Sequence, residues 1–285
     1  MELRDSGQAA LILEVLPRRS QFVRKMAGRK ISEQVIAANV DTALLVSALD
    51  GDFNPRRVER YLAQCWESRA KPVIVLNKVD ACGTPDELAE RMQDVAMGVP
   101  VVLISGKTGQ GFNELETYFI PRSTVVLLGS SGVGKSTIVN RLLGRAIQEV
   151  QPVRESDSRG RHTTTTRELF VLPSGALLID TPGLRELQLW DADEGISQTF
   201  TDIESLAALC RFGNCRHEGE PGCRVQQAVE DGALDPMRLE NWRKVLREQE
   251  FLRRKIDLEA RQNAKRRIKQ IMKDVRRMYR ERDAN

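Results

Sequence analysis

The chain has 285 residues, of which 41% are hydrophobic and 29% charged, and it contains five cysteines. This composition is typical of a globular protein with a sizeable core, and the odd number of cysteines argues against a disulfide framework. No apolar run reaches the roughly 20 residues that a membrane helix needs, and the first residues, MELRDSGQAA, lack a signal-peptide pattern. We therefore expect a cytoplasmic protein with no membrane partner.

The net charge of +4 is unevenly distributed along the chain. Residues 238–285 contain 17 Lys or Arg against 8 Asp or Glu, whereas the other 237 residues contain 27 against 32. A slightly acidic body therefore carries a basic tail. Such a tail suits a polyanionic partner, and a plain solvated helix face is the alternative.

In chain order, the first expected element is a short strand at 11–15, followed by a polar, basic connection. Beyond it, apolar runs that predict buried strands alternate with periodic stretches that predict helices. The expected strands lie at 40–47, 73–76, 101–104 and 124–128, with a hairpin-like pair at 167–172 and 176–180. The expected helices lie at 55–68, 85–97, 113–118 and 135–143. This alternation predicts an α/β fold with a doubly wound, mainly parallel sheet.

A candidate phosphate-binding loop, GSSGVGKST, lies directly after the strand expected at 124–128. It fits the pattern GxxxxGK[ST], whose glycines let backbone N–H groups surround phosphates at a helix N-terminus. Lys135 would reach the β- and γ-phosphates during catalysis, and the Ser136 hydroxyl would bind Mg²⁺. The predicted phosphate-binding residues are Gly129, Ser130, Ser131, Gly132, Val133, Gly134, Lys135, Ser136 and Thr137.

The segment NKVD at 77–80 is expected to select the base of the bound nucleotide. The Asp80 carboxylate can accept two hydrogen bonds from guanine, which adenine cannot offer. Asn77 would brace neighbouring loops, and the stem of Lys78 would cover a face of the ring. A second base loop is expected after the next strand, in the segment SGKTGQG at 105–111. Its candidate residues are Ser105, Gly106 and Lys107.

The segment LLIDTPGL at 177–184 supplies further nucleotide contacts. Asp180 would hold Mg²⁺ through water, and the Gly183 N–H would meet the γ-phosphate. Upstream, RGRHTTTT at 159–166 occupies the place of a switch loop with a Mg²⁺-binding threonine. Thr164 is the favoured ligand, with Thr163 and Thr165 as alternatives.

The catalytic step requires a residue that orients the attacking water. Many GTPases place Gln directly after Asp-x-x-Gly, but this chain has Leu184 there, which has no hydrogen-bonding group. His162 is the best candidate within the chain, because a neutral imidazole can accept a hydrogen bond from water near pH 7.

The order of these segments is unusual, because both base loops precede the phosphate loop. Moving the base loops to the end restores the usual order. Chain termini often lie close together, so joining the old ends and opening new ones before residue 40 would preserve the sheet. We therefore expect a circular permutation.

Four metal-ligand types, Cys210, Cys215, His217 and Cys223, are spaced C-x₄-C-x-H-x₅-C. They predict a closed, tetrahedral zinc site that supports folding and leaves no open position for catalysis.

The chain resembles the circularly permuted, ribosome small-subunit-dependent GTPases of the RsgA (YjeQ) family. The resemblance rests on EVLPRRS (14–20), NKVD, GSSGVGKST, GRHTTT (160–165), DTPGL (180–184) and the Cys-rich segment. It implies a GTPase (EC 3.6.1.-) in late maturation of the small ribosomal subunit, with GTP or GDP, Mg²⁺ and one zinc ion bound. The implied partners are the subunit and its rRNA, and hydrolysis would be stimulated by the subunit.

The family usually begins with an OB-fold, of which only the last strand or two would fit at the start of this chain. We expect an OB-fold remnant and linker at 1–34, a permuted GTPase domain at 35–204, and a zinc module with basic C-terminal helices at 205–285, in a monomer. Two alternatives are an assembly scaffold that binds GTP with little turnover, and a zinc-dependent nucleic-acid binder with a vestigial nucleotide fold.

Overall fold

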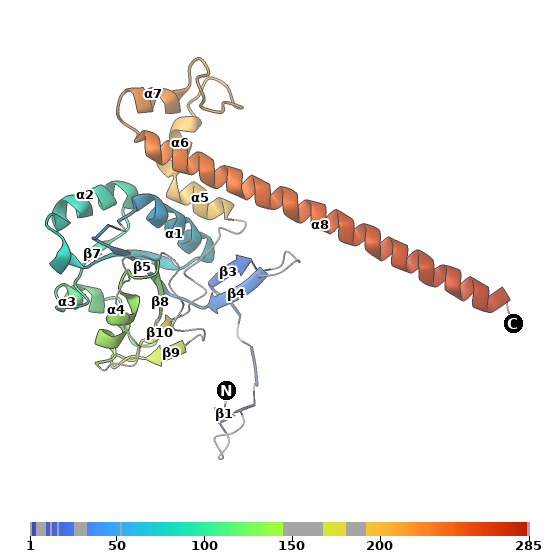
Figure 1. The fold of residues 1–285 in the computed structure, drawn as a ribbon, viewed down its shortest axis with the longest axis horizontal. Coiled ribbons are helices and arrows are strands. Elements are labelled where there is room, and N and C mark those ends of the chain that lie inside the picture. The colour runs from blue at the N-terminus through green and yellow to red at the C-terminus, as the bar shows by residue number, and fades with distance from the viewer. Residues whose placement is uncertain are drawn as a thin grey trace.

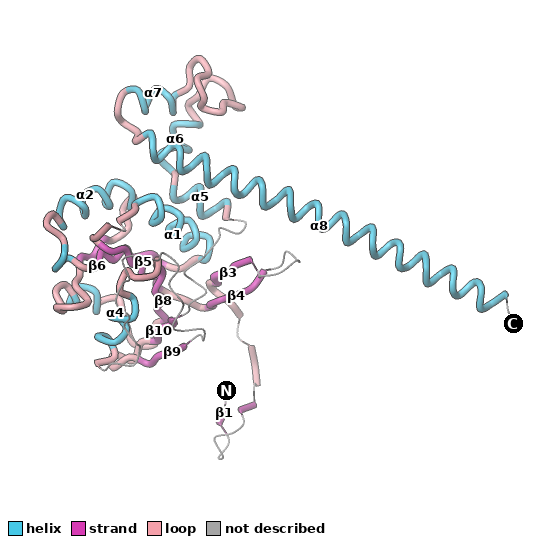
Figure 2. Tube along the Cα trace, in the orientation of Figure 1, coloured by secondary structure: helices cyan, strands magenta, loops and turns pink. Residues whose placement is uncertain are grey.

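The computed structural model describes residues 2–3, 10–11, 13–15, 17–25, 33–51, 53–144, 168–180 and 192–283. An α/β body carries a small helical module, and one long helix extends away from both (Figure 1). Figure 2 shows the strands of the body gathered between helices. Among the helices that the structure describes, none combines the length and hydropathy needed to cross a bilayer.

The body is built on a six-stranded sheet in the order β7-β6-β5-β8-β10-β9. All neighbours pair in parallel except β9, which is antiparallel to β10 at one edge. The strands are β5 (Thr42–Ala48), β6 (Lys71–Asn77), β7 (Val101–Leu103), β8 (Thr124–Leu128), β9 (Glu168–Val171) and β10 (Leu177–Asp180). In the centre, β8 lies between β5 and β10. The strand β5, which comes first among these six in the sequence, therefore pairs with β8, which comes fourth.

Helices cover both faces of this sheet, as the alternation of strands and helices predicted. The helices are α1 (Pro55–Ser68), α2 (Pro85–Ala96), α3 (Phe112–Glu116) and α4 (Lys135–Leu142). Along β5, Leu45 belongs to the core under α1 and α2, whereas Leu44 and Val46 belong to the core under α3 and α4. Successive side chains of a strand point to opposite faces, so a fully apolar strand supplies two cores at once.

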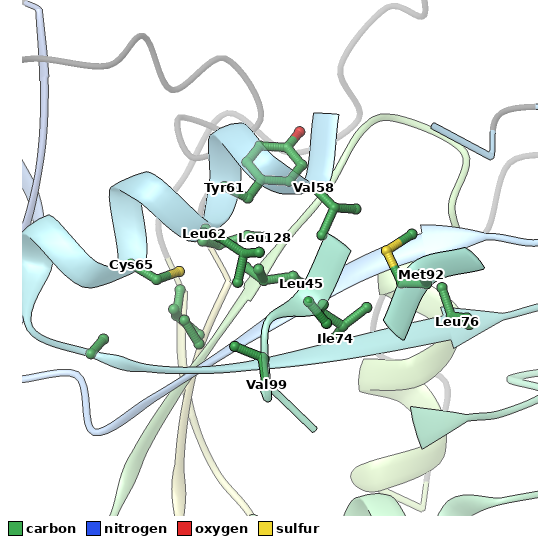
Figure 3. Packing of buried hydrophobic residues seen from close by; sticks show 14 of the residues in the cluster. Leu45, Val58, Tyr61, Leu62, Cys65, Ile74, Leu76, Met92, Val99 and Leu128 are labelled. Atoms are coloured by element: carbon green, nitrogen blue, oxygen red, sulfur yellow. The ribbon is translucent and has the colours of Figure 1, made fainter. Parts of the chain in front are cut away.

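Helix α1 has the bounds that the sequence predicted. The Asn54 side chain caps it by accepting a hydrogen bond from the Arg57 N–H at 3.1 Å, and Pro55 provides a fixed φ at the first helical position. The predicted apolar face of Val58, Tyr61, Leu62 and Cys65 packs on the sheet (Figure 3). Burial raises the pKa of the Cys65 thiol far above its ordinary value.

The N-terminal part differs from the prediction. Two antiparallel pairs are present, β1 (Glu2–Leu3) with β2 (Ala10–Leu11), and β3 (Gln21–Lys25) with β4 (Glu33–Ala38). Of the strand predicted at 11–15, Leu11 lies in β2, but Leu13–Val15 has no regular structure. The strand β3 forms within the supposed connection because Phe22 packs into the core of the body. The predicted boundary at residue 34 falls inside β4, and the division into domains stays a prediction.

The C-terminal part is helical: α5 (Asp193–Thr199), α6 (Thr201–Ala207), α7 (Arg224–Glu230) and α8 (Pro236–Asp283). Within 205–285, where the sequence predicts a zinc module with basic C-terminal helices, the basic end of the chain forms one helix, α8, of 48 residues. The module packs closely on the body, since a Cβ at Gly195 of α5 would lie 1.9 Å from the Ala63 carbonyl oxygen of α1. The predicted boundary between 204 and 205 falls inside α6.

Candidate functional site

The predicted nucleotide-binding segments meet at one edge of the sheet. Asn77 ends β6, Ser105 follows β7, Gly129 follows β8 and Asp180 ends β10. These strands are parallel, so their carboxyl ends share an edge, which is where ligands bind in open α/β sheets. Segments separated by about a hundred positions in the sequence, such as those of Asn77 and Asp180, therefore lie at the same edge.

Asn77 connects the base loop to the phosphate loop. Its side chain is 2% exposed. The amide Nδ2 donates to the Val133 carbonyl oxygen at 2.8 Å, and Oδ1 accepts from the Gly106 N–H at 2.8 Å. The bracing contact predicted from the sequence is therefore present, and it holds together the two loops that would read phosphate and base.

Asp80 lies in a single 3₁₀ turn, Val79–Ala81, directly after β6. Its Oδ1 accepts a hydrogen bond from the Ser105 hydroxyl at 2.6 Å, and the Ser105 oxygen in turn accepts from the Thr108 N–H at 3.0 Å. One carboxylate oxygen is thus fixed by the second base loop. Lys78, whose φ is 69°, pairs its Nζ with the Asp50 carboxylate at 2.6 Å.

The phosphate loop has almost no space for side chains at two of its glycines. Gly129 has a φ of 148°, and a Cβ there would lie 2.3 Å from the Val46 carbonyl oxygen. Gly134 has a φ of 96°, and its Cβ would lie 2.3 Å from Asn77 Nδ2. Both positions need glycine, because the positive φ disfavours other residues and a Cβ would overlap neighbouring atoms.

The other residues of the loop are placed where the pattern predicts. Lys135 opens α4, is 5% exposed, and donates from Nζ to the Gly129 carbonyl oxygen at 2.7 Å. Ser131 and Gly132 are exposed, and Ser136 and Thr137 are half-buried in the first turn of α4. In the second base loop, Lys107 is exposed.

Two arginines that the sequence did not single out hold these loops. Arg141 of α4 donates to the carbonyl oxygens of Gly106 at 3.0 Å and Lys107 at 2.7 Å. Arg57 of α1 donates to the Ser130 hydroxyl at 2.8 Å. No sequence signal could have identified them, because a helical arginine has no diagnostic spacing and its partners are set by the tertiary fold.

Asp180 is 4% exposed at the end of β10, beside the strand that carries the phosphate loop. Gly183, Leu184, His162 and the threonines 163–166 lie outside the described residues. Their proposed roles stay predictions, as do the nucleotide and Mg²⁺ roles of the placed residues.

The four predicted metal ligands lie together in the helical module. Their ligand atoms lie within 4.8 Å of one another. Cys210 Sγ lies 3.6 Å from His217 Nδ1 and 3.9 Å from Cys223 Sγ, and His217 Nδ1 lies 3.4 Å from Cys223 Sγ. A tetrahedral zinc site with ordinary bond lengths has S···S edges of about 3.8 Å and S···N edges of about 3.5 Å. The donor set and its spacing therefore fit zinc.

The surroundings of the cluster lower the pKa of Cys210 and favour a neutral imidazole at His217, whereas burial raises the pKa of Cys215 to about 11. Backbone N–H groups of Arg224 and Gln226 donate to the sulfurs of Cys210 at 3.4 Å and Cys223 at 3.3 Å. Burial and the neighbouring Arg243 lower the pKa of His217. Neutral histidine is the form that binds metal, so this shift supports a metal centre.

A cavity of about 580 Å³ lies at the opposite edge of the sheet, where β5 and β6 begin, between the ends of α1 and α2. Its lining includes Trp66, Lys71, Met97 and Tyr118 and none of the predicted nucleotide-site residues. This cavity is therefore not the nucleotide site, which lies where the loops converge at the carboxyl ends of the strands.

Comparison with known proteins agrees with this architecture. The family model described as RsgA GTPase matches residues 15–190. A relative from Opitutus terrae, named a small ribosomal subunit biogenesis GTPase, is 50% identical over 244 residues, which cover 85% of this chain and 66% of the relative. The chain thus spans about two thirds of the length of that relative.

Two solved structures are also similar. The crystal structure of YjeQ from Thermotoga maritima has a TM-score of 0.58 and 28% identity, over 82% of this chain and 77% of that one. YloQ, described as a circularly permuted GTPase, has a TM-score of 0.55 and 25% identity, over 83% of this chain and 82% of its own. The predicted permutation is confirmed, and the chain belongs to the RsgA GTPase family.

Proposed function

We propose that this chain is a guanine-specific GTPase that acts on the small ribosomal subunit, in the cytoplasm where that particle is assembled. The observation that carries the proposal is the connected set of contacts around Asn77. This residue joins the phosphate loop at Val133 to the base loop at Gly106, and Ser105 of the same base loop holds Asp80. The name of the relative from Opitutus terrae supports the assignment of the particle.

Base selection rests on Asp80. One of its oxygens accepts from Ser105, which orients the carboxylate before any ligand arrives. A preorganised carboxylate can accept from the two neighbouring N–H donors of guanine, and adenine would leave it unpaired. Guanine specificity is the expected result.

Phosphate binding rests on the N-terminus of α4. Its backbone N–H groups and the Lys135 ammonium would neutralise the β- and γ-phosphates. Ser136, Asp180 and Thr164 are the proposed Mg²⁺ contacts, and the ion would supply neutralisation of the charge that develops on the phosphates. The Gly183 N–H would contact the γ-phosphate.

For hydrolysis, His162 is the proposed residue that orients the attacking water. The His162→Ala variant should keep its affinity for GTP and GDP and lose most of the subunit-stimulated rate. The Leu184→Ala variant is the matched control, since this residue stands where many GTPases carry Gln and its replacement removes no polar group. Stimulated turnover of His162→Ala within about twofold of the unaltered protein would exclude this role, because general-base or water-positioning groups contribute about 10²-fold or more.

The zinc module and α8 are the proposed rRNA-binding surface. In the loop between the first two ligands, Phe212 is 42% exposed and the Arg211 guanidinium lies 5.4 Å from its ring centroid. Arg216 and Arg224 are exposed nearby. Arginines paired with an exposed aromatic ring suit unpaired RNA, in which bases stack and phosphates carry charge.

The deciding experiment is GTP hydrolysis with and without purified small ribosomal subunits. Turnover that rises on adding subunits supports the proposal. Tight GTP binding with no stimulated turnover would instead favour the scaffold alternative. Failure to bind labelled GDP would favour a nucleic-acid binder with a vestigial nucleotide fold.

A further inference from the structure

One helix contacts both the nucleotide site and the module that carries α8. Arg57, in the first turn of α1, donates from Nη1 to the Ser130 hydroxyl of the phosphate loop at 2.8 Å. The contact is partly buried, and the Arg57 backbone N–H is fixed by the cap residue Asn54. The N-terminal end of α1 is therefore held directly against the loop that would bind phosphates.

Two residues further along, Glu59 holds the start of α8. Glu59 is completely buried, and its Oε1 accepts from Arg238 Nη1 at 2.7 Å. Its other oxygen accepts from Asn241 Nδ2, and Arg56 pairs with the same carboxylate. A buried carboxylate requires such partners, because an unpaired charge in the interior is strongly unfavourable.

The α8 side of this junction is equally constrained. The Arg238 guanidinium also donates to both carboxylate oxygens of Asp202 at 2.8 Å and to the Thr199 carbonyl oxygen at 2.8 Å. It lies 5.0 Å from the ring centroid of Phe200. Arg238 therefore joins α8 to α1, α5 and α6 through one planar group with fixed geometry.

Arg57 and Glu59 lie in the same turn of a capped helix, so the two contacts cannot move independently by much. If the phosphate loop shifts Ser130, either the Arg57 contact breaks or α1 moves. Movement of α1 would disturb the bonds to Glu59. We propose that Arg57 is a positioning residue that couples the phosphate loop to the anchor of α8, so that nucleotide binding and docking of α8 stabilise each other.

This inference rests on the proposed function, since it needs the phosphate loop to bind nucleotide. Coupling between two sites is reciprocal and is measured by the failure of two substitutions to add. Asn241→Ala is the suitable change at the anchor, because it removes a neutral donor and leaves Glu59 paired with Arg56 and Arg238. Arg57→Ala is the change at the nucleotide site.

GDP affinity should be measured by titration with a fluorescent GDP analogue for the unaltered protein, both single variants and the double variant. We expect Asn241→Ala to weaken binding about three- to tenfold when Arg57 is present, and by less than about twofold in the Arg57→Ala background. Ser130→Ala should reproduce the loss of coupling, because it removes the acceptor of the Arg57 hydrogen bond. Arg57→Lys should restore part of it.

Arg253→Ala is the matched control. Arg253 is also an arginine of α8 that pairs with a carboxylate, but this carboxylate is Asp193 at the start of α5 and does not belong to the Glu59 network. It should leave GDP affinity within about twofold in both backgrounds. An equal effect of Arg253→Ala would contradict the route through α1.

Amide hydrogen exchange gives a readout that a purely local role of Arg57 would not change. In the unaltered protein, GDP should slow exchange in residues 238–249 at the start of α8, and in Arg57→Ala this protection should be lost. An additive cycle, or equal protection in both proteins, would overturn the inference alone. Failure of the unaltered protein to bind GDP would overturn the proposed function as well.

Discussion

Gly134 illustrates how little freedom single residues have in the phosphate loop. A Cβ there would lie 2.3 Å from Asn77 Nδ2, and the φ of 96° already disfavours any other residue. We expect Gly134→Ala to displace Asn77 from both loops and to weaken GDP binding by about 10- to 100-fold, the range for losing one or two buried hydrogen bonds. Equilibrium titration with labelled GDP measures this.

Gly144→Ala is the control for backbone strain alone. Gly144 follows α4 with a φ of 66°, but no atom lies within 4 Å of its added Cβ. This variant should lose about 1 kcal/mol of unfolding free energy and keep its GDP affinity. Similar GDP affinities for the two variants would contradict the role given to the Asn77 contact.

Asp80→Asn tests base reading. The Ser105 hydroxyl donates to Asp80 Oδ1, so an amide at position 80 should turn its oxygen towards Ser105 and its NH₂ group towards the base. That NH₂ group would oppose the donors of guanine and match the additional carbonyl oxygen of xanthine.

We therefore expect the preference to move from GTP towards xanthosine triphosphate by about 10- to 100-fold, the range for hydrogen bonds to a charged group. Competition binding with the two nucleotides measures it. Asp86→Asn, an exposed carboxylate in the first turn of α2, controls for the loss of charge. Unchanged selectivity in Asp80→Asn would remove Asp80 from the base site.

At the scale of elements, the zinc segment should behave as a folding unit. We expect one zinc ion per chain, and Cys215→Ser should unfold the segment after about residue 205, because metal binding supplies the folding free energy of such sites. GDP binding should persist, weakened by about the three- to tenfold expected for loss of the α8 anchor. Elemental analysis and hydrogen exchange measure the two effects. Cys82→Ser, which lies outside the cluster, is the control, and zinc-free protein with a folded segment would contradict the prediction.

The junction of α1 with α8 should depend on its buried charge more than on its exposed ones. Glu59→Ala would leave Arg238 without its α1 partner, and breaking a buried pair costs about 3–5 kcal/mol. Thermal unfolding should therefore begin at a clearly lower temperature. Glu250→Ala removes a partner of Arg254 that is 61% exposed, and it should cost less than about 1 kcal/mol. Equal shifts in both variants would contradict the importance of the buried network.

Elements with a strong local signal were predictable, and elements fixed by distant contacts were not. The apolar run of β8 and the capped, periodic sequence of α1 gave bounds that the structure confirms. The strand β3, QFVRK, has only two apolar residues, and it forms because β4 pairs with it and Phe22 enters the core. In α8, Val245 is fully buried in one cluster with Val225 and Ala228 of α7, whereas its neighbour Leu246 is 38% exposed, and helical spacing alone does not say which of the two faces the module.

The same distinction applies to the site. Asn77, Asp80 and Lys135 were identified because nucleotide chemistry demands those residue types at those spacings. Arg57 and Arg141 were missed because their partners, Ser130 and the Gly106 carbonyl, come close only after the sheet has formed.

At the scale of the whole molecule, the basic end of α8 should dominate the salt dependence of subunit binding. Residues 265–285 contain nine Lys or Arg against three Asp or Glu. Ending the chain before Lys265 should weaken binding and flatten the plot of log affinity against log salt by about 0.7–0.9 for each lost phosphate contact. GDP affinity of the shortened protein is the control, and an unchanged slope would mean that this segment does not touch RNA.

The length of α8 sets how far its C-terminal end lies from the start of the helix. A helix of 48 residues is about 72 Å long at 1.5 Å per residue, and among the side chains of α8 that the structure describes the last buried one is Gln249. Deletions in α8 beyond Gln249 can therefore change separately the length of the helix and the direction in which its tip faces. Deleting seven residues shortens the reach by about 10 Å and turns the tip by only about 20°, whereas deleting five shortens it by about 7.5 Å and turns the tip by about 140°. A partner whose binding depends on the length of α8 should respond similarly to the two deletions. A partner that contacts one face of the helix should lose binding only with the five-residue deletion.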